Sequence, residues 1–154
     1  MECILCKIID NQIASRKIYE DEDNIAILDI NPASPGHTLV VPKKHADSIF
    51  AMDSLDLRRM IEVVKLVAEK MKKELRADNL NIILNNGKLA GQIIDHVHFH
   101  VVPRFPNDRI NFTIPRYQMT DEQFWEVQSK LVINTELPPK PEPKPEAVEQ
   151  GKSE

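Results

Sequence analysis

Three histidines at alternate positions in residues 96–100 (HVHFH) constrain the fold of this chain more than any other feature. Successive side chains of a β-strand point to opposite faces, so a strand would carry the three imidazoles on one face and the intervening apolar side chains on the other. The apolar face would anchor the strand in a core, and the imidazoles would lie about 7 Å apart. We therefore predict a strand over residues 96–102, ended by Pro103.

Apolar patterns elsewhere predict a mixture of helices and strands. Apolar residues recur at helical spacing from Leu57 to Leu75, after a candidate N-cap at Asp53 or Ser54. Residues 120–123 have the form of a capping box and open a second helix. Short apolar runs bounded by turn residues predict three more strands, over residues 24–30, 37–42 and 80–84. The strands over residues 80–84 and 96–102 are hairpin-like, which favours an antiparallel α+β sheet.

The chain is long enough for one domain with its own core, because it has 154 residues, 42% hydrophobic and 29% charged. No apolar run approaches the ~20 residues that span a bilayer, and the N-terminus lacks the pattern of a secretory signal. We therefore expect a cytoplasmic protein with no membrane partner.

The net charge of −4 and the lack of a basic stripe argue against a nucleic-acid partner. A few local donors can still hold a small anionic ligand.

The C-terminal segment, residues 135–154, differs from the rest of the chain in composition. It contains five of the 11 prolines and very few apolar residues. Proline removes backbone donors and the charged residues resist burial, so we predict a solvated, disordered tail. This leaves a single domain over residues 1–134.

Three interpretations of the histidine face imply different chemistry. The imidazoles could simply form a solvated strand face. A tri-histidine metal site is the second interpretation, but residues at positions i, i+2 and i+4 of one strand fan out and do not converge on an ion. Imidazole is well suited to nucleophilic attack and proton transfer near neutral pH. We therefore favour a nucleophile with neighbouring phosphate contacts.

The two cysteines, Cys3 and Cys6, form a Cys-x-x-Cys pair at the N-terminus. A cytosolic chain keeps thiols reduced, which argues against a structural disulfide. A thioredoxin-like redox pair would need a preceding strand, for which two residues leave no room. A metal site or two ordinary small residues remain.

Residues 91–104 (GQIIDHVHFHVVPR) resemble the signature of the histidine triad (HIT) superfamily. Upstream segments resemble the same family in the same order, over residues 3–8, 27–32, 35–45 and 84–92. The resemblance implies a HIT-like antiparallel sheet of about five strands with one long and one short helix. It also implies a homodimer with a continuous larger sheet, joined through the long helix and the strand over 80–84.

The resemblance implies chemistry at the α-phosphate of a purine nucleotide. In that family the middle histidine attacks phosphorus, so His98 would form a nucleotidyl-histidine intermediate that water resolves. His100 and His37 would contact the phosphate oxygens. The implied activity is hydrolysis of an adenosine phosphoramidate. The alternatives are a diadenosine tetraphosphate-type hydrolase, a nucleotide-binding regulatory protein with little catalysis, and a zinc-dependent hydrolase.

The resemblance also implies a nucleotide pocket. Asp29 would accept hydrogen bonds from the ribose hydroxyls, and Asn85 and Gln92 would donate to the phosphate. The backbone N–H groups after Gly91 would approach it closely, because glycine lacks a side chain. The walls around the base would be Ile8, Leu28 and Ile30. The residue types alone leave simpler roles open, a strand end for Asp29 and turns for His37 and Asn85.

Members of the family with an N-terminal cysteine pair hold a structural zinc ion with two thiolates and two imidazoles. The four matching residues in this chain are Cys3, Cys6, His45 and His96. Such an ion would pin the strand that carries His98, a structural task. The chain departs from the family at Ile93, where several members carry a hydroxyl residue, so that contact to the phosphate or leaving group should be missing.

Overall fold

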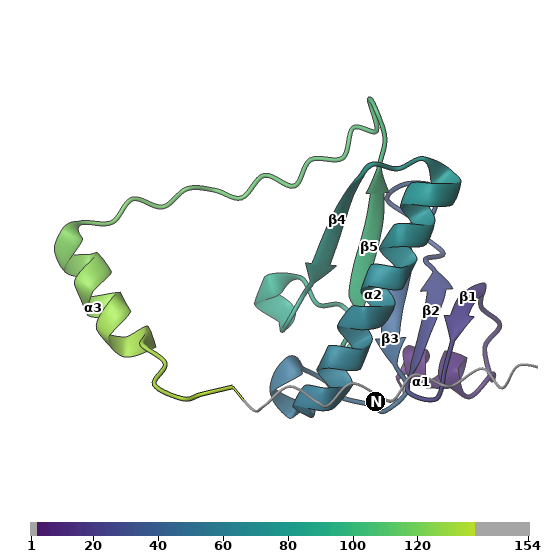
Figure 1. Cartoon of the computed structure of the whole chain (residues 1–154), viewed down its shortest axis with the longest axis horizontal. Coiled ribbons are helices and arrows are strands. Elements are labelled where there is room, and N and C mark those ends of the chain that lie inside the picture. Colours follow the sequence, from purple (N-terminus) through teal and green to yellow (C-terminus); the bar gives the residue numbers. More distant parts are fainter. Residues whose placement is uncertain (1–2, 138–154) are drawn as a thin grey trace, which may run out of the picture. The chain divides into compact units, whose positions relative to one another are not determined.

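The computed structural model describes residues 3–137 and contains a five-stranded antiparallel sheet with the strand order β1-β2-β3-β5-β4 (Figure 1). The strands are β1 (Lys17–Glu20), β2 (Asn24–Leu28), β3 (Thr38–Pro42), β4 (Asn79–Leu84) and β5 (Phe99–Arg104). The predicted α+β class, the antiparallel sheet and the pairing of the last two strands are therefore confirmed.

The strand that carries the histidine run begins later than predicted. β5 starts at Phe99, so His96 and His98 precede it. Its ladder with β3 ends at the pair formed by Val40 and Phe99. β3 continues to Pro42, which has no N–H to extend the ladder, and the carbonyl of Pro42 faces the His96 ring instead. The predicted boundary of 96 was therefore wrong, although the alternation of side chains holds.

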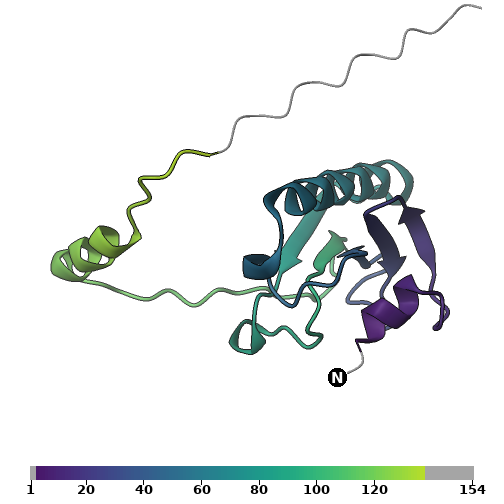
Figure 2. The same ribbon diagram turned by 90° about the horizontal axis from the view of Figure 1, so that it is seen from below.

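Helix α2 (Ser54–Leu75) covers one face of the sheet (Figure 2). The Asp53 side chain caps it by accepting a hydrogen bond from the Leu55 N–H at 2.7 Å, and Arg76 ends it in the left-handed conformation. The buried residues of α2 pack against the apolar side chains of β2, β3 and the histidine run. This core contains Ala26, Val40, Ala46, Met60, Val63, Val64, Val67, Met71, Val97, Phe99 and Val101.

The opposite face of the sheet is covered by α1 (Ile4–Ile9), which the sequence patterns did not predict (Figure 2). Leu5 of α1 is 1% exposed and packs on a second core. The other buried members of that core are Ile25, Ile27, Leu39 and Val41. Six residues are too few to establish a helical period. The patterns also missed β1, because its four residues are too few to establish a clear alternation.

The described contacts divide the chain after Asn111, within the predicted domain of 1–134. The second unit contains α3 (Asp121–Leu131), the predicted capped helix, with both hydrogen bonds of the capping box between Thr120 and Gln123. Within the described residues, no side chain of α3 is buried. The predicted tail lies outside the described residues from position 138 onward. None of the described helices is long and apolar enough to cross a membrane.

Candidate functional site

The ends of β2, β3 and β5 bring together one carboxylate and three imidazoles. His37 Nε2 lies 3.0 Å from His100 Nδ1, and His37 Nδ1 lies 3.6 Å from Asp29 Oδ2. The rings of His98 and His100 are 4.9 Å apart, centre to centre. His37 and His98 are each only 6% exposed. The interpretation of the histidines as a solvated strand face was therefore wrong.

The tautomer of His98 follows from its hydrogen bond. Its Nδ1 lies 2.7 Å from the backbone carbonyl oxygen of His96, and a carbonyl oxygen can only accept. Nδ1 must therefore carry the proton, which leaves the lone pair of the neutral ring on Nε2. The site thus contains an imidazole whose free nitrogen is held in its nucleophilic form.

A chain of hydrogen bonds fixes the other two imidazoles in the same way. The Ala33 N–H donates to His37 Nδ1 at 3.1 Å, so the proton of neutral His37 sits on Nε2. That N–H donates to His100 Nδ1, and the proton of neutral His100 is therefore on Nε2. His100 consequently presents an N–H donor at the end of the chain.

Burial keeps the imidazoles of His37 and His100 neutral. Burial lowers the pKa of His100 to about 4. The neighbouring titratable rings of His98 and His37 lower it further, and the Asp29 carboxylate opposes the shift. Burial also lowers the pKa of His37, again against the effect of Asp29. At pH 7 both rings are therefore uncharged, as the assigned donors and acceptors require.

The residues predicted to bind the nucleoside differ in exposure and in what they contact. Asp29 follows β2 and accepts a hydrogen bond from the Asn31 N–H at 2.8 Å through Oδ1. Leu28, at the end of β2, is half-buried, whereas Ile30 is 78% exposed. Ile8 packs against the core under α1. The structure thus places Asp29 at the cluster, beside His37.

Residues 85–92, the phosphate loop, follow β4 within the segment 84–92 that resembles the phosphate loop of the family, and they contain the 3₁₀ helix Lys88–Ala90. Gly87 and Gly91 have φ of 94° and 86°, in the region that favours glycine, and Asn85 Nδ2 donates to the Gly91 carbonyl at 3.4 Å. Gln92 is 6% exposed and its side chain bonds to backbone groups of the protein. Ile93, where the family often has a hydroxyl residue, is 94% exposed.

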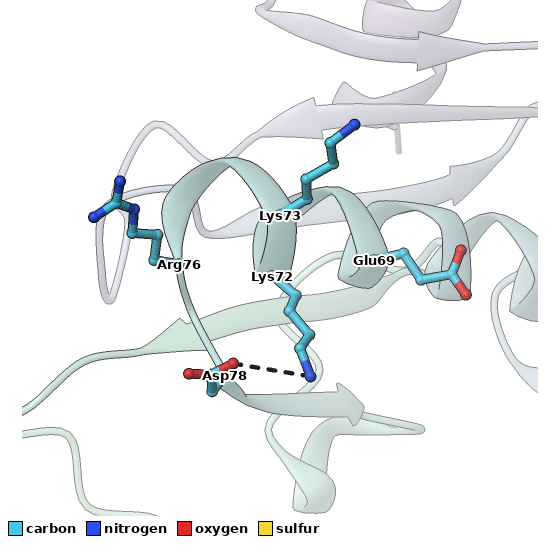
Figure 3. A pocket seen from close by; sticks show the side chains of 5 residues that line it. All are labelled: Glu69, Lys72, Lys73, Arg76 and Asp78. Carbon is cyan, nitrogen blue, oxygen red and sulfur yellow. Dashed lines mark ion pairs between the residues drawn. The ribbon is translucent and has the colours of Figure 1, made fainter.

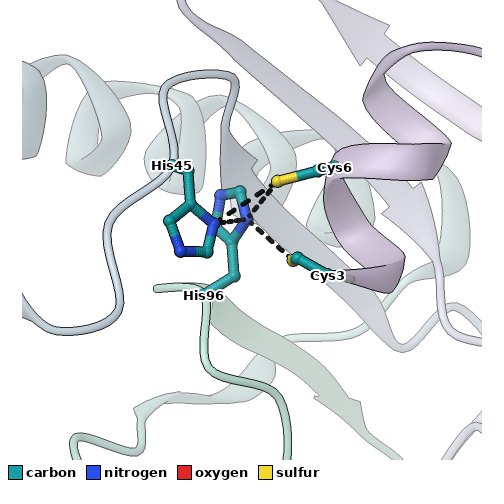
Figure 4. Close-up of side chains that lie close together, drawn as sticks. All are labelled: Cys3, Cys6, His45 and His96. Atoms are coloured by element: carbon teal, nitrogen blue, oxygen red, sulfur yellow. Dashed lines mark hydrogen bonds between the residues drawn. The ribbon is translucent and has the colours of Figure 1, made fainter. Parts of the chain in front are cut away.

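A second cluster joins α1 to the histidine run through the four residues predicted to bind zinc (Figure 4). Their ligand atoms all lie within 4.8 Å of one another. His45 Nδ1 and His96 Nδ1 are 3.3 Å apart, and Cys6 Sγ lies 3.3 Å and 3.6 Å from these two nitrogens. Cys3 Sγ lies 3.3 Å from His96 Nδ1. A tetrahedral zinc ion requires about 3.3 Å between two nitrogens and about 3.6 Å between sulfur and nitrogen.

The protonation of the cluster suits a cation. His96 Nε2 lies 2.9 Å from the Pro42 carbonyl oxygen and must donate to it, so the lone pair on Nδ1 faces the other ligands. Burial lowers the pKa of His96, which favours this neutral form. Burial and the neighbouring Cys3 raise the pKa of the Cys6 thiol to about 11, so a bound cation is what would hold it as a thiolate. The four residues could therefore hold a metal ion.

A separate hollow at the C-terminal end of α2 offers no comparable chemistry (Figure 3). It is lined by Glu69, Lys72, Lys73, Arg76 and Asp78. Lys72 pairs with Asp78 at 3.8 Å. These are flexible charged side chains at a helix end, without a nucleophile, so the histidine cluster is the candidate site.

The sequence motifs did not predict the backbone groups that orient the histidines of the two clusters. The carbonyls of His96 and Pro42 and the N–H of Ala33 fix the tautomers of three histidines. Every residue has these groups, so no residue type marks them in a sequence.

Comparison with known proteins finds one family. The model described as "HIT domain" matches residues 10–107. An uncharacterised HIT-like protein of Methanocaldococcus jannaschii is 50% identical over 106 residues, 69% of this chain and 81% of that protein. The adenosine 5'-monophosphoramidase of Schizosaccharomyces pombe is 36% identical over 137 residues, 85% of this chain and 99% of that protein.

Among solved structures, a zinc-bound histidine triad family protein from Mycobacterium smegmatis superimposes with a TM-score of 0.69. It is 39% identical, and the match covers 73% of this chain and 81% of that chain. The residues matched by the family model, 10–107, thus include all five strands of the sheet and the histidine run.

Proposed function

Because this chain belongs to the HIT domain family, we propose that it hydrolyses a purine nucleoside phosphoramidate, with His98 as the nucleophile toward the α-phosphorus. The observation that carries the proposal is the 2.7 Å hydrogen bond between His98 Nδ1 and the His96 carbonyl, which leaves the lone pair on Nε2. The similarity to the adenosine 5'-monophosphoramidase of Schizosaccharomyces pombe supports the choice of substrate.

The reaction proceeds in two displacements at phosphorus. In the first, His98 Nε2 bonds to phosphorus, the bond from phosphorus to the leaving nitrogen breaks, and the released amine takes up a proton. The ring then carries a positive charge, which the His96 carbonyl stabilises through the Nδ1–H. In the second, water attacks phosphorus and loses a proton to the solvent, the bond to Nε2 breaks with its electron pair returning to the ring, and the nucleoside monophosphate and neutral His98 are released.

Neutral donors stabilise the charge that develops on the phosphate oxygens. His100 offers its Nε2–H, directed by the hydrogen bond from His37 at 3.0 Å. Backbone N–H groups after Gly91 would donate to the same oxygens, because glycine has no side chain to keep the phosphate away. Donors that are already in position need no rearrangement when the transition state forms, and this is the main contribution that a protein makes to phosphoryl transfer.

Asp29 recognises the nucleoside through the ribose hydroxyls. It lies beside His37, and its Oδ2 accepts no conventional hydrogen bond from the described residues, with His37 Nδ1 at 3.6 Å. The purine base lies against Ile30, which is well exposed, and beside Leu28 and Ile8. Asn85 lies in the phosphate loop. Its amide donates one hydrogen to the Gly91 carbonyl, and the second hydrogen would donate to the phosphate.

A zinc ion bound by Cys3, Cys6, His45 and His96 serves the structure. The distances between the ligand atoms and the zinc-bound structural neighbour support the assignment. When bound, the ion supplies a cross-link between α1, the segment after β3 and the residue whose carbonyl orients His98. No step of the reaction passes through it.

The protein forms a homodimer through β4 and α2. β4 is an outer strand of the sheet, and Ile82 on it is 50% exposed. Ile61 on α2 is 46% exposed. Pairing of two β4 edges would extend the sheet across both copies and cover an edge that otherwise invites aggregation.

One side-by-side assay separates the proposed activity from its alternatives. Purified protein is incubated with adenosine phosphoramidate and with diadenosine tetraphosphate, and AMP release is followed with and without a metal chelator. We expect faster turnover of the phosphoramidate, loss of turnover in His98→Ala, and a lower melting temperature with chelator before any loss of rate. Preference for the dinucleotide selects the polyphosphate hydrolase, and AMP binding without turnover selects the regulatory protein.

A further inference from the structure

We propose that Gln92 is a positioning residue that holds the phosphate loop in shape and does not itself donate to the phosphate. The inference rests on the proposed function, because residues 85–92 are a phosphate loop only if a nucleotide binds there. It departs from the role that the resemblance implies, in which the amide of Gln92 donates to the phosphate. The two roles differ in which acceptors receive the two hydrogens of that amide.

All the hydrogen-bonding groups of the buried Gln92 amide are already used within the protein. Nε2 donates to the Asp47 carbonyl at 2.8 Å and to the Ile94 carbonyl at 3.0 Å. Oε1 accepts from the Gly87 N–H at 2.7 Å. An amide has two donor hydrogens, so no N–H of the Gln92 side chain remains for a phosphate oxygen.

Gln92 joins the end of the loop to Gly87 through its backbone as well as its side chain. The Ala90 N–H donates to the Gly87 carbonyl at 3.0 Å, and the Gln92 N–H donates to it at 3.1 Å. Gln92 therefore pairs with Gly87 through its backbone N–H and through its side chain. The loop also has the bonds from the Gly91 N–H to the Lys88 carbonyl at 3.0 Å and from Asn85 Nδ2 to the Gly91 carbonyl, and the Gln92 side chain adds the one that holds the Gly87 N–H.

Gln92 also ties the loop to the segment that follows β3. The bond to Asp47 crosses 45 positions in sequence, and a second bond joins the Ile49 N–H to Asn86 Oδ1 at 2.9 Å. On that segment, the Ala46 carbonyl accepts from the Val97 N–H at 2.8 Å, one residue before the nucleophile. The loop and His98 are thereby held against the same short stretch of backbone.

Gln92→Leu tests the inference, since it keeps the approximate size of the side chain and removes its three hydrogen bonds, to Gly87, Asp47 and Ile94. In nucleotide-free protein we expect hydrogen exchange of the Gly87 amide, followed by NMR, to quicken about tenfold, which corresponds to about 1.4 kcal/mol. The Kd for AMP should rise by a similar factor. Gln128→Leu, the same change at an exposed position on α3, is the matched control and should alter neither quantity.

If the leucine variant does not fold, Gln92→Glu provides the second measurement. Glutamate keeps the acceptor for the Gly87 N–H and loses both donors, so the loop should separate from the segment after β3. We then expect exchange of the Ile49 amide to quicken about tenfold. Unchanged exchange at Gly87 and Ile49 with weaker AMP binding would make Gln92 a phosphate ligand and overturn the inference, as would no change in any of these quantities. Exchange is measured without nucleotide, so its result stands even if the protein proves to have no phosphoramidase activity.

Discussion

Acid should destabilise this protein through its buried, neutral histidines. Burial lowers the pKa of His100 from 6.5 to about 4. Between these values the unfolded chain takes up a proton at this position and the folded protein does not. The contribution of His100 to stability is therefore complete above pH 6.5, declines as the pH falls from there, and stops changing below about pH 4.

The size of the effect follows from the number of protons. Each proton bound by the unfolded state alone lowers the free energy of unfolding by about 1.4 kcal/mol per pH unit. His37, whose pKa burial also lowers, acts in the same direction. Between pH 6 and pH 4.5 the two residues should therefore together produce a slope of at most about 2.7 kcal/mol per pH unit, of which His100 supplies about 1.

Urea denaturation at half-unit intervals from pH 4.5 to pH 7 measures this slope, and His100→Asn isolates one residue. Asparagine does not titrate, so the slope of the variant should be smaller by up to one proton's worth, about 1.4 kcal/mol per pH unit, whatever its stability at pH 7. Equal slopes for the two proteins would show that His100 is not buried in its neutral form, and the assignment of its tautomer would be wrong.

Three further substitutions test other parts of the account. Asp29→Asn should weaken AMP binding about tenfold in calorimetry, the equivalent of about 1.4 kcal/mol, and should leave 2′,3′-dideoxy-AMP unaffected, because the lost interaction is with the ribose hydroxyls; equal losses for both ligands would contradict this role. Cys6→Ser should reduce the bound zinc measured by atomic absorption and lower the melting temperature to that of chelator-treated wild-type protein, and full zinc content would count against the four-residue site. Met60→Ala, at a side chain 0% exposed beneath α2, should cost about 2–5 kcal/mol in urea denaturation, and a cost below about 1 kcal/mol would mean that the core is packed differently.

The period of the histidine run predicted its packing correctly but not the extent of its strand. Val97 and Phe99 lie in the core beneath α2, as alternation requires. The strand nevertheless starts at Phe99, because its boundary depends on hydrogen bonds to β3, and those end where Pro42 has no N–H to give. A ladder is a property of two segments, so a pattern within one of them cannot locate its end.

The site could be predicted only in part, for a similar reason. The contact of His37 with His100 joins residues 63 positions apart, and that of Cys3 with His96 joins residues 93 positions apart. No spacing within the sequence indicates such contacts, and here only the resemblance to a family united the residues. Gln92 shows the opposite limit, since its residue type suits a phosphate donor and a loop brace equally, and only its bonds distinguish the two.

The central claim is that Nε2 of His98 becomes covalently bonded to phosphorus during turnover. Rapid acid-free quenching of protein mixed with excess adenosine phosphoramidate, followed by peptide mass spectrometry, tests it most directly. The account predicts an adenylyl group on the peptide that contains His98, located at that histidine by fragmentation and absent from His98→Asn. Steady release of AMP with no adduct on any histidine, or with the adduct on His100, would contradict it.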